Sequence, residues 1–193
     1  MSAIRIGISA CLLGQKVRFD GGHKRDAFLT ETLAPHVEWV PVCPEVEVGM
    51  GTPREPLRLV RENGRTRMIT TQKAIDHTEA MNAWAAGRLD ELIREDLDGY
   101  VLKKDSPSCG LDGVPRYRDD GSAPRDGRGL FAEALVERMP LLPVEDEARL
   151  ADPRVRAHFL ARVLAFRRLK DRSRGRAPEP ALERIERLLR THD

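Results

Sequence analysis

The sequence contains few cysteines, and none of them form the close pair that is typical of a zinc knuckle. Only three cysteines occur among 193 residues, and an odd number excludes complete disulfide pairing within one chain. No apolar run approaches the roughly 20 residues that a membrane-spanning helix needs, and no long apolar leader segment follows Met1. We therefore expect a cytoplasmic protein with no membrane-embedded part, in which reduced thiols serve metal binding or catalysis.

A strong charge of one sign is also missing from the chain as a whole. The formal net charge is only +2 at pH 7, which does not by itself indicate a nucleic-acid-binding protein. The charge is uneven, however: residues 146–193 carry 13 Lys and Arg against 8 Asp and Glu, whereas residues 1–145 carry 20 against 23. We therefore expect a basic helical tail over residues 146–193 that is distinct from a domain over residues 1–145. We also expect the protein to be a monomer.

Short apolar segments alternate with helical patterns along the chain. Strands are predicted at 4–9, 37–42, 100–102 and 141–144, a hairpin at 57–69, and helices near 26–33, 71–97 and 130–139. Residues 43–56, 112–129 and 171–180 are rich in Pro, Gly or charged residues and are expected to be loops. This alternation predicts an α/β fold with an open, mainly parallel, Rossmann-like sheet of about four strands flanked by helices. Helices at 155–169 and 181–189 would add a C-terminal helical appendage.

Each of the three cysteines follows one of the predicted strands. Cys11 comes just after residues 4–9, Cys43 directly after residues 37–42, and Cys109 one short loop after the strand near residue 102. The carboxyl ends of parallel strands share one edge of a sheet, where open α/β folds build their ligand sites. Three thiolates converging there would hold a metal or an iron–sulfur cluster with one position left open.

The spacing of the cysteines narrows the choice of metal without settling it. The intervals are 32 and 66 residues, unlike the short local loops of structural zinc sites. Three thiolates without a fourth protein ligand suit a [4Fe-4S] cluster that has one iron not bound by protein. Catalytic zinc stays open as an alternative, with solvent as its fourth ligand or with His23 or His77 completing a Cys₃His set.

Polar side chains lie close to two of the cysteines in the sequence. Glu45 is two residues beyond Cys43; if a cluster forms there, its carboxylate would act as a general base toward water, and otherwise it is a solvated loop carboxylate. Ser106 and Ser108 precede Cys109, and their hydroxyls would hydrogen-bond to a substrate or relay a proton. Serines beside Pro and Gly also favour tight turns, so a purely structural role stays open for them.

Several separate motifs resemble, in order, those of the 2-thiouracil desulfidases, a family formerly described as a domain of unknown function. The resemblance covers Ile4 to Glu145 and includes the motifs Ser9–Gly14, Val17–Gly22, Val42–Glu45, Gly49–Arg54 and Lys104–Gly110. Residues 147–169 resemble the start of a second domain of unknown function that is often fused behind the first.

The resemblance implies both a cofactor and a reaction. It implies a [4Fe-4S] cluster held by Cys11, Cys43 and Cys109, whose fourth iron binds the sulfur of a thiolated base and acts as a Lewis acid. Glu45 would then shuttle protons, assisted by Ser106, while water replaces sulfur without net redox change. The expected substrate is 2-thiouracil or a related thio-base or nucleoside, with thiolated tRNA as a possible larger one. A zinc-thiolate hydrolase and a non-enzymatic RNA-associated protein remain the alternatives.

Overall fold

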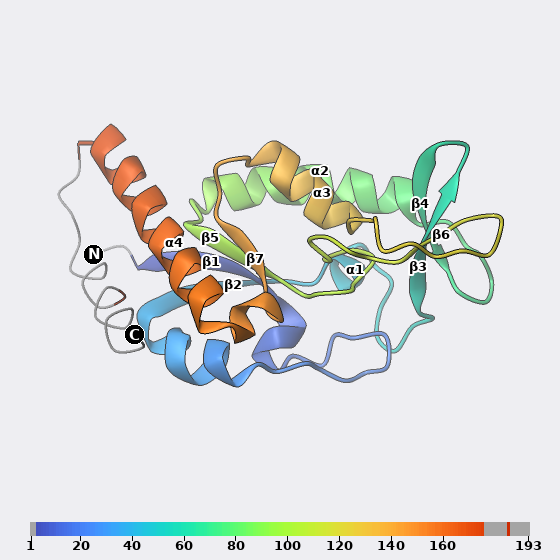
Figure 1. Cartoon of the computed structure of the whole chain (residues 1–193), viewed down its shortest axis with the longest axis horizontal. Helices are drawn as coiled ribbons and strands as arrows, with labels where there is room; N and C mark the ends of the chain where they lie inside the picture. Colours follow the sequence, from blue (N-terminus) through green and yellow to red (C-terminus); the bar gives the residue numbers. More distant parts are fainter. Residues whose placement is uncertain (1–2, 176–184, 186–193) are drawn as a thin grey trace.

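A four-stranded parallel sheet forms the centre of the molecule, in a computed structural model that describes residues 3–175 and 185 (Figure 1). Its strand order is β2–β1–β5–β7. The strands are β1 (Ile4–Ser9), β2 (Val37–Val42), β5 (Gly99–Leu102) and β7 (Val144–Asp146), all paired in parallel. The predicted α/β fold with a mainly parallel sheet is therefore confirmed. Strand β7 begins at Val144 rather than at Leu141, which is 72% exposed and precedes the sheet.

Helices cover both faces of this sheet. On one face, the isoleucines of β1 pack against a π-helix over Phe28–Leu33 and against α4 (Pro153–Ser173). On the other face, β2 and β5 pack against α2 (Thr78–Arg94) and α3 (Leu130–Arg138). Further helical turns occupy Ala10–Leu13, Ala34–His36 and Arg149–Ala151. Burial on both faces explains why the central strand β5 is apolar throughout, whereas the edge strand β2 contains the exposed Glu38.

Strand β1 shows how the sequence fits these two layers. Ile4, Ile6 and Ile8 alternate along it, and all three are buried on the α4 side. Gly7 faces the other side, where a Cβ atom would stand only 2.3 Å from the ring of Tyr100 on β5. The missing side chain therefore makes room for a buried aromatic ring on the neighbouring strand.

A second, smaller sheet stands at the end of the molecule opposite α4 (Figure 1). It contains β3 (Leu57–Glu62) and β4 (Arg65–Thr70), which form the predicted hairpin, and β6 (Arg116–Tyr117) in the order β4–β3–β6. The expectation that residues 112–129 are entirely loop was wrong, because Arg116 and Tyr117 pair in parallel with β3. Helix α2 also begins at Thr78 instead of residue 71, because the residues before it run back along β4, where Asp76 bridges to Ile69 and the His77 amide donates to the Met68 carbonyl at 2.9 Å.

Helix α4 packs on the main sheet through a buried stripe that contains Phe159, Leu160, Val163 and Leu164. It ends at Ser173, so the predicted linker from Asp171 onward was wrong at its start. Buried Asp171 pairs with Arg167 one helical turn earlier, with Nε to Oδ2 at 3.0 Å, and this pair favours continuation of the helix. The predicted helix over 181–189 lies outside the described residues except for residue 185. Within residues 3–175 and 185, no helix is both long enough and apolar enough to cross a bilayer.

Candidate functional site

The three cysteines lie at the carboxyl edge of three neighbouring strands, β2, β1 and β5. Cys11 sits in the helical turn after β1, Cys43 immediately after β2, and Cys109 in the loop that follows β5. All three line one pocket of about 340 Å³, together with Glu45, Ser106, Ser108 and other residues. The parallel topology therefore brings together side chains that are up to 98 positions apart in the chain.

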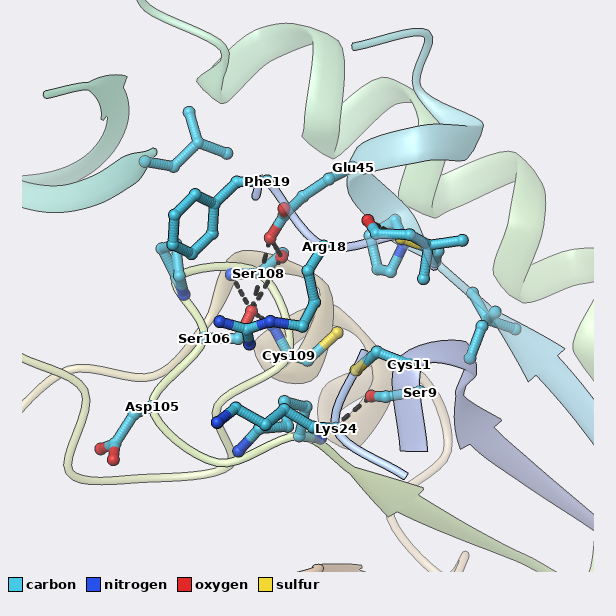
Figure 2. A pocket seen from close by; sticks show the side chains of 18 of the residues that line it. Ser9, Cys11, Arg18, Phe19, Lys24, Glu45, Asp105, Ser106, Ser108 and Cys109 are labelled. Carbon is cyan, nitrogen blue, oxygen red and sulfur yellow. Dashed lines mark hydrogen bonds between the residues drawn. The ribbon is translucent and has the colours of Figure 1, made fainter. Parts of the chain in front are cut away.

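The sulfur atoms differ in their surroundings within this pocket. Figure 2 shows the side chains of Cys11 and Cys109 directed toward each other across the pocket. The Cys43 thiol instead lies 3.7 Å from the backbone carbonyl of Val17, with sulfur as the donor. All three thiols are free, and Cys43 is the most exposed of them. Among the described side chains, no three His, Cys, Asp or Glu groups lie close enough to hold one metal ion.

Burial makes the thiols poor acids in this structure. It raises the pKa of Cys11 to about 11, with the nearby Lys103 ammonium opposing that rise. It raises the pKa of Cys109 further, against a hydrogen bond with Ser9, and it also raises the pKa of Cys43. At neutral pH the metal-free thiols are therefore protonated, and any metal that they bind must displace these protons.

Glu45 faces the loop of Ser106 and Ser108 across the pocket (Figure 2). Its Oε1 atom accepts hydrogen bonds from Ser108 Oγ at 2.5 Å and from Ser106 Oγ at 3.5 Å. The two hydroxyl oxygens are 3.1 Å apart, so the carboxylate and both hydroxyls form one continuous hydrogen-bonded chain. Such a chain can move a proton between the carboxylate and a molecule in the pocket.

A short helix that the sequence reasoning missed positions Glu45. Residues 43–56 were expected to be loop, but Pro44–Glu47 form α1, with Pro44 in the first turn, where its missing N–H costs nothing. Glu47 accepts the Cys43 amide at 2.9 Å and also pairs with Arg88 of α2 at 3.2 Å. These contacts tie Cys43 and α1 to the body of the protein.

The loop that contains Ser106 and Ser108, here called the serine loop, is fixed by hydrogen bonds within the loop and by close packing behind it. Ser106 Oγ accepts hydrogen bonds from the amides of Ser108 at 3.2 Å and Cys109 at 3.1 Å, which makes a tight turn. Gly129 lies directly behind it, where a Cβ atom would be 2.5 Å from the Ser108 carbonyl. The structural and the proton-relay readings of these serines are therefore compatible.

Sequence reasoning also missed two polar residues of the pocket. Arg54 is almost fully buried and pairs with Glu45, with Nε to Oε2 at 3.0 Å. Ser9 at the end of β1 accepts the Lys103 amide at 2.9 Å and lies beside Cys109. Ser9 and Arg54 each lie in a motif shared with the desulfidase family, Ser9–Gly14 and Gly49–Arg54. Apart from that resemblance, nothing in the sequence pattern distinguishes them as site residues. His23 and His77, considered as a fourth zinc ligand, are not among the residues that line this pocket.

The chain is similar to known proteins both in sequence and in structure. A family model described as 2-thiouracil desulfurase matches residues 6–147, which include all three cysteines, Glu45 and both serines. The uncharacterized protein YbbK of Bacillus subtilis (strain 168) is 32% identical over 108 residues, covering 53% of this chain and 71% of that protein. A solved structure described as the [4Fe-4S]-dependent thiouracil desulfidase TudS is 32% identical, with a TM-score of 0.60, over 76% of this chain and 93% of that one.

Proposed function

The chain belongs to the 2-thiouracil desulfurase family, and from this premise we propose that it is an iron–sulfur-dependent desulfidase that removes sulfur from a thiolated nucleobase. The family and the structural neighbour, itself described as a [4Fe-4S]-dependent thiouracil desulfidase, support the activity. The observation that carries the proposal is the single pocket in which three free cysteines stand beside a carboxylate and two hydroxyls.

The donor set of this pocket fits a [4Fe-4S] cluster with one iron not bound by protein. Cys11, Cys43 and Cys109 supply three soft sulfur ligands, the type that iron–sulfur clusters take. A single zinc ion would hold neighbouring thiolates about 3.8 Å apart, whereas a cluster would carry each thiolate on a different iron. The description of the structural neighbour as [4Fe-4S]-dependent supports the cluster over the zinc alternative. When bound, such a cluster would supply a Lewis-acidic iron for the sulfur of the substrate.

The proposed reaction is a hydrolysis without net oxidation or reduction. The oxygen of one water molecule forms a C–O bond at the thiocarbonyl carbon, and the C–S bond breaks. Sulfur leaves as hydrogen sulfide and takes up the two protons that the water gave, so thiouracil becomes uracil and no electron acceptor is needed.

In this proposal the residues of the chain move protons and orient the reactants. Glu45 takes a proton from the attacking water and passes it on toward the leaving sulfur, which is general acid–base catalysis. Ser108 and Ser106 extend the reach of the carboxylate through their hydroxyls, which already bond to Oε1. The low exposure of Glu45, 14% of its side chain, limits exchange of these protons with solvent.

The substrate class is a small thiolated base or its nucleoside, with thiolated tRNA as a larger candidate. The pocket is lined by Arg18, Lys24, Lys103 and Lys104 besides the residues already described. Sulfide release from 2-thiouracil, thiouridine and thiolated tRNA, measured side by side, distinguishes these sizes.

Anaerobic reconstitution followed by a sulfide-release assay tests the proposed function. We expect the wild-type protein to bind about four irons and to release sulfide from 2-thiouracil. Glu45→Gln should keep its iron but lose roughly 100-fold or more in kcat, because the general base is gone. Glu38→Gln is a matched control, since Glu38 lies at the opposite end of β2 and pairs with Arg5. Iron-loaded protein that releases no sulfide from any of the three substrates would refute the proposal.

A further inference from the structure

Arg54 is a buried cation in the Pro- and Gly-rich segment before β3, and its contacts converge on the pocket. Its side chain is 6% exposed. The guanidinium donates to Glu45 Oε2 through Nε at 3.0 Å and through Nη2. It also donates to the carbonyls of Val17 through Nη2 at 3.0 Å and of Gly51 through Nη1 at 2.8 Å. One planar group therefore joins α1, the loop after β1 and its own loop.

The two carboxylate oxygens of Glu45 have different hydrogen-bond partners. Both guanidinium contacts go to Oε2, whereas the hydroxyls of Ser108 and Ser106 bond to Oε1. Two donors on Oε2 fix the position of that oxygen, and the orientation of the carboxylate is set once the serine hydroxyls bond to Oε1. Oε1 is thus directed at the serine loop by a group on the other side of Glu45.

The Val17 carbonyl links Arg54 to the cysteine side of the pocket as well. It accepts hydrogen bonds from the Arg54 guanidinium at 3.0 Å and from the Cys43 thiol at 3.7 Å. The Val17 carbonyl therefore has a donor in Arg54 in addition to the Cys43 thiol.

Resting on the proposed function, we propose that Arg54 is a positioning residue for the desulfuration: it holds Glu45 by Oε2 so that Oε1 reaches the serine hydroxyls and the reacting molecule. Arg54 acts through Glu45 and does not itself exchange protons. Lysine cannot replace it fully, because an ammonium is a point charge without the planar fork that meets several acceptors at once.

Kinetics on the iron-loaded variants provide the first test. We expect Arg54→Ala to lower kcat about 10- to 100-fold, the loss typical of a catalytic group displaced by about 1 Å, with KM changed less than about threefold and iron content equal to wild type. The kcat of Arg54→Lys should lie between that of wild type and that of Arg54→Ala. The double variant Arg54→Ala/Glu45→Gln should be no slower than Glu45→Gln alone. Arg138→Ala is the control, since Arg138 forms an exposed ion pair with Asp90 on α2.

Guanidinium binding to the iron-free protein provides a second test that does not depend on activity. Millimolar guanidinium should enter the space vacated in Arg54→Ala, bind the Glu45 carboxylate and raise the Tm by about 2–4 °C. It should also restore part of the lost kcat in the loaded protein. Neither effect is expected in Arg138→Ala or in the double variant that lacks the carboxylate.

These measurements separate failure of the positioning role from failure of the proposed function. Wild-type kcat in loaded Arg54→Ala, or iron lost from that variant without rescue by guanidinium, would overturn the positioning role. If loaded wild type releases no sulfide, the proposed function fails, and the guanidinium shift still decides whether Arg54 and Glu45 form the inferred unit. Should Arg54→Ala not fold, equal kcat in Arg54→Lys and wild type would overturn the proposal, whereas a slower Lys variant with full iron would support it.

Discussion

Gly129→Ala should disturb the serine loop from behind, without touching any group that is proposed to react. An alanine Cβ there would lie 2.5 Å from the carbonyl carbon and oxygen of Ser108 and 2.8 Å from the Cys109 nitrogen. Carbon atoms pack at 3.5–4.0 Å, so the loop or α3 must move by about 1 Å. The obstacle is backbone, which cannot rotate away as a side chain would. Overpacking of this kind costs about 2–3 kcal/mol of unfolding free energy.

Gly87→Ala is the matched control, since the same substitution meets nothing within 4 Å at that exposed position of α2. There alanine should stabilise the protein by about 0.5–1 kcal/mol, because glycine is the poorer helix former. Urea unfolding of the iron-free proteins measures both changes. A displaced loop should also lower the kcat of loaded Gly129→Ala about 100-fold. If Gly129→Ala is as stable as wild type, the close packing of Gly129 against Ser108 is wrong.

Three further substitutions test other parts of the structure. Asp98→Ala should cost about 3–5 kcal/mol in urea unfolding, because buried Asp98 pairs with Lys170 at 2.7 Å and with Arg167 at 3.2 Å and also accepts the Arg5 amide at 2.9 Å, and all three contacts are lost; a loss below 1 kcal/mol would contradict it. The Cys11 thiol has a pKa of about 11 in the folded protein and an ordinary value of 9.0, so the unfolded chain loses its proton first. As pH rises from about 9 to 11, the stability of iron-free wild type should therefore fall by about 2 kcal/mol more than that of Cys11→Ser; equal slopes would refute this. Ser108→Ala removes the 2.5 Å bond to Glu45 and should lower kcat about 10- to 100-fold with iron content unchanged, and an unchanged kcat would remove Ser108 from the proposed relay.

The main sheet could be predicted because its strands are short, apolar and separated by helical patterns. That the cysteines would meet followed from one rule, that parallel strands end at the same edge, and the strand order β2–β1–β5 satisfies it. Helix α4 was found from its apolar stripe. Its C-terminal end was not, because Asp171 stays helical through a buried ion pair that the local sequence does not reveal.

The parts that could not be predicted depend on contacts between distant segments. Strand β6 has only two residues and exists because β3 offers it a free edge. Arg54 reads as one more charged loop residue until the fold brings it to Glu45 and Val17. The hydrogen-bonded chain from Glu45 to the serines spans 63 positions, and no local pattern encodes a pairing of that kind.

The most direct test of the central claim is to measure iron content and sulfide release on the same anaerobically reconstituted sample, for wild type and for Cys→Ser variants at positions 11, 43 and 109. The account predicts about four irons per wild-type chain and sulfide formed in step with uracil. Each of the three variants should lose both iron and activity. Sulfide release that persists in any one of these variants, or a wild-type chain that takes up no iron, would contradict it.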